Sequence, residues 1–283
     1  MTEPFVDTET DRTKSRWVAE ALRDFGRPRT TVRALFYFAM RRGVSDYPIC
    51  GKFVGEIRIT RPYHESDGER LSKWVGRARQ LGFIPVDAIL DEVPGERIFA
   101  PSSEGNRLHR IEVWLNKSAL SPLLQPVCEK YGATLASIGR KPSKAAIDSL
   151  YQRSAGHPTI IACLSDLNAS SLAFCRDLAV EIAKEKPAGE WDIRLKRVGI
   201  TAEHVLNLGL PQVAGERSGS VDQAYYKKYI EPYRLNPRKM SELDALEAYY
   251  PGGIGGFVDD ALSKIDGTDK EKLLLDLKEG NRP

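Results

Sequence analysis

The stretch "PTIIACLSDLNASSLAFCRDLAVEIAK", residues 158–184, decides the fold class of this chain. Its first half, from Thr159 to Leu164, is an apolar run without a polar face, which is typical of a strand that is buried on both sides. Its second half has apolar residues at helical spacing, and Ser170 or Ser171 can cap the start of that helix. A buried strand followed at once by a helix predicts a parallel sheet covered by helices.

The flanking segments repeat this alternation of strand and helix. We predict strands at 109–116, 133–139 and 191–200, and helices at 117–132 and 141–156. The fold class is therefore α/β, with a parallel sheet and helices on both faces. In such sheets ligands bind beyond the carboxyl ends of the strands. Asn116 ends the first strand, and Asp166 and Asn168 end the third, so these three residues define a candidate site.

The first ninety residues have a different pattern. Helices are predicted at 13–26, 27–43 and 66–85, with a β hairpin or wing at 51–63, and Thr30 or Thr31 and Gly43 are the expected caps of the second helix. This order suggests a winged-helix or helix-turn-helix module. The segment 92–107 is rich in Gly, Pro and Ser and is the predicted linker. We thus expect an N-terminal DNA-binding domain over 1–91 and a second domain over 108–283.

Positive charge is concentrated in that N-terminal part, although the net charge of the chain is only +3. Nine Lys or Arg residues lie between positions 12 and 42, against two acids, and Arg70, Lys73 and Arg77 recur at helical spacing. Phosphate-binding surfaces have such an excess, but so do solvated helix faces. The candidate DNA-binding residues are Arg29, Arg33, Arg41, Arg42, Arg70, Lys73, Arg77 and, from the second domain, Arg217.

Length and composition limit the possible classes of protein. A chain of 283 residues fits two domains, and no apolar stretch approaches the roughly 20 residues that cross a bilayer. The polar N-terminus has no signal-peptide core, and the four cysteines lie too far apart for a zinc site or a disulfide framework. We expect a cytoplasmic protein that has no membrane partner.

Five segments in this order resemble a known family: 31–43 "TVRALFYFAMRRG", 77–91 "RARQLGFIPVDAILD", 111–120 "IEVWLNKSAL", 197–211 "RVGITAEHVLNLGLP" and 241–248 "SELDALEA". The chain is similar, over roughly residues 30–262, to Toprim-domain proteins of the topoisomerase VI A subunit and meiotic double-strand-break transesterase family. This resemblance implies a winged-helix domain followed by a Toprim domain. It also implies double-stranded DNA as a partner and a two-fold homodimer.

Proteins of this family attack DNA with a tyrosine of the winged-helix domain. Tyr37 matches the position of that tyrosine, while Ala34 replaces an acid of the family pattern. Helical spacing places Arg33, Tyr37 and Arg41 on a face different from the apolar one, so the phenol could approach a phosphate. The other interpretation is a tyrosine at the rim of the core with its hydroxyl in water.

The family also binds Mg²⁺ with a glutamate at the end of the first strand and an Asp-x-Asp at the end of the third. The matching residues here are Asn116, Asp166 and Asn168, so two carboxylates have become neutral amides. Because amides add no charge to offset dehydration of the ion, we expect weak Mg²⁺ binding at most and no other cofactor. Asn168 is equally suited to cap the following helix. Glu242 and Asp244 match a late acidic segment of the family, but the sequence does not place them.

These residues lead to two functional hypotheses. The first is a DNA-binding protein with a degenerate Toprim site that acts as a binding or regulatory module; the sequence leaves open whether a separate protein partner takes part. The alternative is an active, metal-dependent DNA transesterase or nuclease that uses Tyr37. The loss of two acids favours the first hypothesis.

Overall fold

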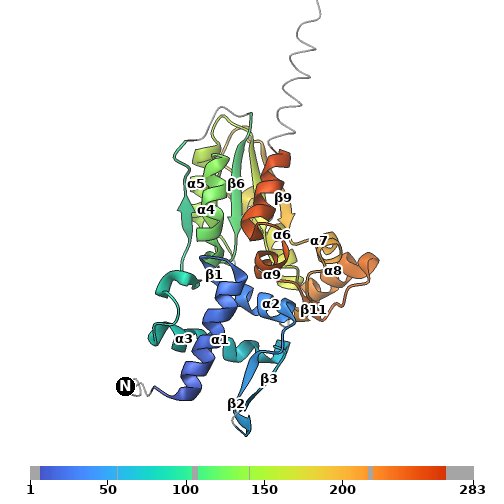
Figure 1. Ribbon diagram of the computed structural model, residues 1–283. Coiled ribbons are helices and arrows are strands. Elements are labelled where there is room, and N and C mark those ends of the chain that lie inside the picture. Colours follow the sequence, from blue (N-terminus) through green and yellow to red (C-terminus); the bar gives the residue numbers. More distant parts are fainter. Residues whose placement is uncertain (1–6, 56, 104–107, 140, 216–218, 266–283) are drawn as a thin grey trace, which may run out of the picture. The chain divides into compact units, whose positions relative to one another are not determined.

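A computed structural model describes residues 7–55, 57–103, 108–139, 141–215 and 219–265 (Figure 1). The chain divides into two compact units, residues 1–91 and residues 92–283. Among the described residues, no helix has both the length and the apolar character needed to cross a membrane.

The first unit consists of three helices and an antiparallel hairpin. The helices are α1 (Glu9–Phe25), α2 (Val32–Arg42) and α3 (Gly68–Gln80), and the hairpin pairs β2 (Tyr47–Val54) with β3 (Ile57–Arg61). A short parallel pair joins β1 (Thr30–Thr31) to β4 (Ile89–Leu90). The predicted caps of α2 are confirmed: the Thr31 side chain accepts the Ala34 N–H, and Gly43 ends the helix with a φ of 68°.

Aromatic rings form the core of this unit. The Trp17 ring of α1 lies 5.2 Å from Tyr47, 5.6 Å from Tyr63 and 5.9 Å from Trp74, measured between ring centroids. Trp17 belongs to α1, Tyr47 to the hairpin and Trp74 to α3, and Tyr63 follows the hairpin. Contacts among these rings therefore join the three elements. The apolar side of α3 faces this cluster, which leaves its charged residues on the outside.

The second unit is a mixed α/β structure around a five-stranded sheet. Its strands are β5 (Arg97–Phe99), β6 (Arg110–Leu115), β7 (Thr134–Ser137), β8 (Thr159–Leu164) and β9 (Ile193–Gly199), in the spatial order β5-β7-β6-β8-β9. The four strands β7, β6, β8 and β9 are parallel, as predicted, whereas the edge strand β5 runs antiparallel to β7. The expectation of a wholly parallel sheet is therefore wrong at this edge.

The segment 92–107 is not simply the linker that we predicted, because it contributes β5 to the sheet. Three backbone pairs join Arg97–Phe99 to β7. Hydrogen bonds from Ser118 and Ser143 to Glu92 and Glu96 attach the same segment to the second unit. This short edge strand is held by backbone pairing with β7, and its side chains are not buried. It therefore lacks the alternation of apolar and polar residues by which a strand is recognised in a sequence.

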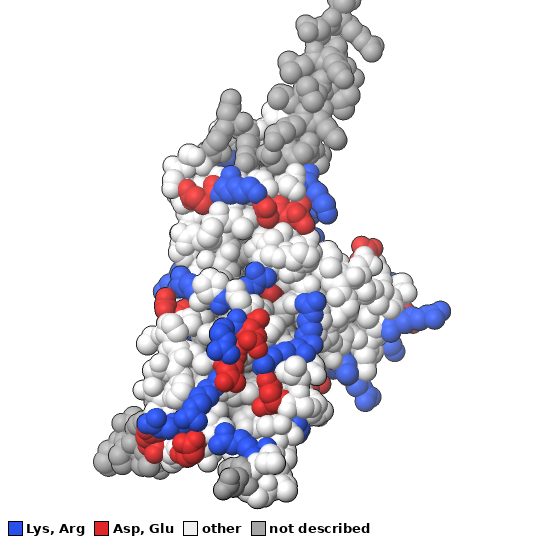
Figure 2. Space-filling model, viewed as in Figure 1, with Lys and Arg blue, Asp and Glu red and all other residues white. Residues whose placement is uncertain are grey.

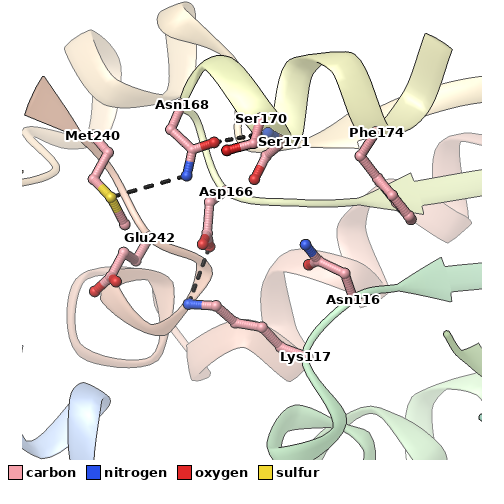
Figure 3. Close-up of a pocket in the computed structure, with 9 residues that line it drawn as sticks. All are labelled: Asn116, Lys117, Asp166, Asn168, Ser170, Ser171, Phe174, Met240 and Glu242. Carbon is pink, nitrogen blue, oxygen red and sulfur yellow. Dashed lines mark hydrogen bonds and ion pairs between the residues drawn. The ribbon is translucent and has the colours of Figure 1, made fainter. Parts of the chain in front are cut away.

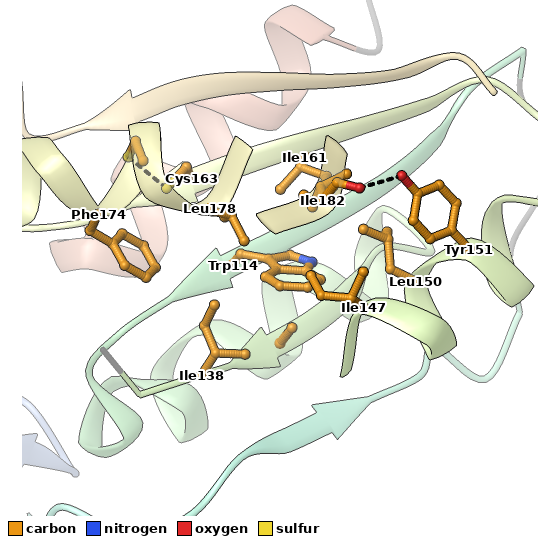
Figure 4. Packing of buried hydrophobic residues seen from close by; sticks show 12 residues of the cluster. Trp114, Ile138, Ile147, Leu150, Tyr151, Ile161, Cys163, Phe174, Leu178 and Ile182 are labelled. Atoms are coloured by element: carbon orange, nitrogen blue, oxygen red, sulfur yellow. Dashed lines mark hydrogen bonds between the residues drawn. The ribbon is translucent and has the colours of Figure 1, made fainter. Parts of the chain in front are cut away.

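Helices cover both faces of the sheet. They are α4 (Ser121–Lys130), α5 (Lys144–Ser154), α6 (Ala169–Lys184) and a helix over residues 253–265. Beside the sheet lie α7 (Ala202–Leu208), α8 (Ser220–Ile230) and α9 (Leu243–Tyr249), with a small pair of strands β10 (Val213–Ala214) and β11 (Lys239–Met240) (Figure 1). On one face α5 and α6 enclose the fully buried Trp114 (Figure 4), and the Tyr151 hydroxyl donates to the Ile182 carbonyl at 2.6 Å. On the other face the 253–265 helix approaches β9 so closely that a Cβ at Gly199 would lie 2.8 Å from the Phe257 ring.

Candidate functional site

The carboxyl ends of β6 and β8 bring the predicted site residues together. The two strands are parallel neighbours, with Leu115 opposite Leu164, so the residues that follow them lie at one edge of the sheet. A cavity of about 390 Å³ opens there (Figure 3). It is lined by Asn116, Lys117, Asp166, Asn168, Ser170, Ser171, Phe174, Met240 and Glu242.

The acidic segment that the sequence did not place also reaches this edge. Leu167 and Ser241 exchange backbone hydrogen bonds of 2.8 and 3.2 Å, which hold the segment before α9 against the loop that follows β8. The Leu243 N–H then donates to the Asp166 carboxylate at 2.8 Å. As a result, Glu242 lines the cavity and Asp244 lies in the first turn of α9 beside it.

Lys117 is the central residue of the site, and the sequence analysis missed it. Its Nζ lies 2.7 Å from Asp244 Oδ2 and 3.2 Å from Asp166 Oδ1. The side chain of Lys117 is 19% exposed, that of Asp244 is 5% exposed and that of Asp166 is 8% exposed. The sequence held a signal for the contact with Asp166 only, because a lysine directly follows Asn116 at the strand edge that also carries this aspartate.

The surroundings favour the charged form of Lys117. Burial lowers the pKa of the ammonium, but the carboxylates of Asp166, Asp244 and Glu242 raise it more, so the net pKa is well above the ordinary value. Burial raises the pKa of Asp166, while Lys117 and the Leu243 N–H lower it in part. The Lys117 ammonium and the Leu243 N–H both contact Asp166 Oδ1, and both are hydrogen-bond donors. An ionised carboxylate, which only accepts hydrogen bonds, needs such donors.

Asn168 caps α6. Its Oδ1 accepts the Ser171 N–H at 2.7 Å, and its backbone is extended, with a φ of −150°. The expectation that Asn168 caps this helix is confirmed, whereas the expectation of a cap at Ser170 or Ser171 is wrong, because the helix begins at Ala169. The third residue, Asn116, has a buried Oδ1 with no hydrogen-bond partner among the described residues.

These residues do not fit the Mg²⁺ ion that the family resemblance implies. The Asn168 oxygen is engaged by the α6 backbone, and the Lys117 ammonium lies 3.2 Å from Asp166 Oδ1. Across the part of the chain that the structure describes, no group of three or more His, Cys, Asp or Glu side chains is arranged to hold a metal ion. Glu112 does not contribute either, because its carboxylate binds Arg153 and the Trp114 ring N–H in the core.

Tyr37 is fully buried, so the interpretation of a rim tyrosine with its hydroxyl in water is wrong. Its ring packs edge-on against Phe36 at 5.0 Å, and its hydroxyl accepts a 3.4 Å hydrogen bond from Arg33. Four consecutive residues of α2, from Ala34 to Tyr37, are buried. The helix therefore has no wide solvent face of the kind that its spacing suggested.

The basic residues predicted to bind DNA in and around α2 differ in their contacts and in their exposure. Arg42 pairs with Asp24 and Asp46, each at 2.7 Å, and so has a structural role. Arg33 stacks on the Phe36 ring at 4.2 Å. Arg29 and Arg41 are exposed, and Arg217 lies outside the described residues.

The charge along α1 is mixed. Figure 2 shows Lys and Arg side chains interspersed with Asp and Glu over the face along α1. Arg12 pairs with Asp7 at 2.5 Å, and Arg16 pairs with Glu9 at 3.2 Å. The excess of basic residues between positions 12 and 42 is thus partly neutralised within the unit.

The stripe on α3 lines two hollows that share Lys14, Arg70 and Trp74, and we call them together the α3 groove. One hollow, of about 490 Å³, is lined by Lys14, Tyr47, Pro48, Ile49, Cys50, Lys52, Arg61, Arg70 and Trp74. The other, of about 670 Å³, is lined by Asp11, Lys14, Arg70, Lys73, Trp74, Gly76, Arg77 and Gln80. Arg61 is held by Asp67 at 2.6 Å. The other cations of the groove come from α1, α3 and the hairpin: Lys14, Lys52, Arg70, Lys73 and Arg77. Lys14 lies 3.9 Å from Asp11, an acid that also lines the groove.

Comparison with known proteins does not identify a family for this chain. No protein-family model matches it, and no curated protein matches it.

Proposed function

We propose that the chain binds double-stranded DNA through the α3 groove. The observation that carries this proposal is the set of five cations from three elements that line the two adjoining hollows of the groove. Contacts of Lys and Arg with phosphates supply most of the affinity of such proteins for duplex DNA. The three helices and the hairpin of the first unit are also the elements that a winged-helix domain requires.

We propose further that the second unit is a Toprim-like domain whose catalytic site is degenerate. The four parallel strands and the polar residues at the ends of β6 and β8 support the likeness. Asn116, Asn168 and the placement of Lys117 support the loss of the metal site. The alternative of an active transesterase has less support, because Tyr37 is buried.

The salt dependence of DNA binding tests the first proposal. Neutralising about five phosphates gives a slope of log affinity against log salt near −4 to −5 in fluorescence anisotropy with a short duplex. Replacing Arg70 and Lys73 by alanine should weaken binding and reduce the slope by about 2, because about one unit is lost for each phosphate contact. Binding should not require a divalent metal ion, so it should persist in EDTA.

A matched control uses two lysines of the second unit. Lys184 is exposed and lies at the end of α6, and Lys186 follows it. Replacing both by alanine removes the same charge but no groove residue, so affinity and slope should stay at the wild-type values. Equal losses in the two double variants would show that the groove is not the contact surface.

We also propose a two-fold homodimer, on the family resemblance alone. Such a dimer would present two equivalent grooves to one duplex. Light scattering should give twice the chain mass, free or with DNA. A monomer under both conditions would refute this proposal.

A further inference from the structure

The path of Lys117 joins two elements at the carboxyl edge of the sheet. Its side chain starts where β6 ends and crosses toward the end of β8 (Figure 3). There Nζ contacts Asp166 of the β8 loop and Asp244 of α9, at 3.2 and 2.7 Å. One ammonium thus contacts carboxylates that are 78 positions apart in the sequence.

An ammonium and a divalent cation cannot both occupy this place. A Mg²⁺ ion binds carboxylate oxygens at about 2.0–2.1 Å, so an ion shared by Asp166 and Asp244 would lie in the gap that Nζ fills. Buried carboxylates need a cation for their stability, and the ammonium already supplies one.

We propose that Lys117 is a built-in cation that replaces a divalent metal ion between Asp166 and Asp244. The lysine holds β6, the β8 loop and α9 together without any metal ion, and it prevents an oxygen-ligated divalent cation from binding there. Removal of the ammonium converts the same carboxylates into a divalent cation site. This inference does not depend on DNA binding, so it can fail or succeed independently of the proposed function.

The test compares Lys117→Met with Lys117→Arg, using Mn²⁺ alone as the probe. Mn²⁺ prefers oxygen ligands and is visible by electron paramagnetic resonance. We expect the wild type and Lys117→Arg to bind no Mn²⁺ at this site, because both keep a cation there. Lys117→Met should bind one Mn²⁺ with a sub-millimolar Kd, and Mn²⁺ should raise its melting temperature.

Addition of Asp166→Asn to Lys117→Met should abolish that binding. Two results would overturn the proposal: Mn²⁺ binding to the wild type that Asp166→Asn abolishes, or a folded Lys117→Met variant that binds no Mn²⁺. If Lys117→Met does not fold, NMR of ¹⁵N-lysine-labelled wild-type protein decides the question. The Lys117 ammonium signal, assigned by its loss in Lys117→Arg, should be unchanged by millimolar Mg²⁺, and a shift of that signal on titration would contradict the proposal.

Discussion

Replacement of Lys117 by methionine should destabilise the second unit by about 3–5 kcal/mol, the usual cost of removing one partner from a buried ion pair. Methionine has a similar length and fills the space of the lysine stem, so the change removes mainly the charge. Asp166 and Asp244 are 8% and 5% exposed, so both carboxylates are largely removed from bulk water. The magnitude thus comes from two buried carboxylates that lose a shared cation.

Thermal unfolding measures this cost. Each 1 kcal/mol shifts Tm by about 2–4 °C for 150–250 residues, so we expect the Tm of the unit to fall by about 6–20 °C. Lys130→Met is the matched control, because Lys130 also pairs with an aspartate, Asp259 at 2.6 Å, but its side chain is 59% exposed. Exposed ion pairs contribute little, so this variant should melt with the wild type. Equal Tm values for the two variants would refute the buried-cation reasoning.

The pH dependence of the same pair has a defined sign. The pKa of Lys117 is raised, so its contribution to stability is fully present below the unfolded lysine pKa of about 10.4 and is lost only as the pH rises further. Burial raises the pKa of Asp166, so the charged form becomes costly as the pH rises above about 4, most of all when Lys117 is absent. The deficit of Lys117→Met should therefore be smaller at low pH than at neutral pH, in urea unfolding followed by circular dichroism.

Three further predictions concern other contacts. Burial raises the pKa of Asp67, but hydrogen bonds from Arg61 and from the His64 backbone lower it more, so the net pKa lies below the ordinary value. The stability that Asp67 gives the first unit is therefore present above about pH 3.9, and it is lost as the pH falls through the lower pKa of the folded state. Asp67→Asn should be less stable at neutral pH and should lose less on acidification, in urea titrations. Asn168→Ala should cost about 1 kcal/mol through loss of the α6 cap, whereas Asn168→Asp keeps an acceptor and should unfold at nearly the wild-type urea concentration. Asn116→Glu combined with Asn168→Asp should still bind no Mn²⁺ by calorimetry while Lys117 is present.

The fold was largely predictable where local chemistry determines it. The apolar run of β8 predicted a buried parallel strand. For α2, the predicted caps were Thr30 or Thr31 and Gly43, and the structure has Thr31 and Gly43. The edge strand at Arg97–Phe99 was missed, because its stability comes from backbone pairing with a distant strand. Tyr37 was misplaced for a related reason: a helical wheel shows one apolar face but not the other elements that bury a second one.

The candidate site was predictable only in part. The ends of β6 and β8 predicted that Asn116 and Asp166 meet, because adjacent parallel strands end at one edge. The contact between Lys117 and Asp244 joins residues 127 positions apart, and no local pattern indicates it. It depends on the pairing of Leu167 with Ser241, which is a property of the folded backbone.

The central proposal is that the protein binds DNA but does not cleave it with the help of a metal ion. Supercoiled plasmid in millimolar Mg²⁺ or Mn²⁺ tests this proposal most directly. A gel-shift assay should show the wild-type protein bound to the plasmid, and the same samples, deproteinised with protease and detergent, should show fully supercoiled DNA. The physical reason is that the Lys117 ammonium, not a metal ion, lies against Asp166, while Tyr37 is buried. Nicked or linear plasmid that disappears in Tyr37→Phe would contradict this conclusion and identify the protein as an active transesterase.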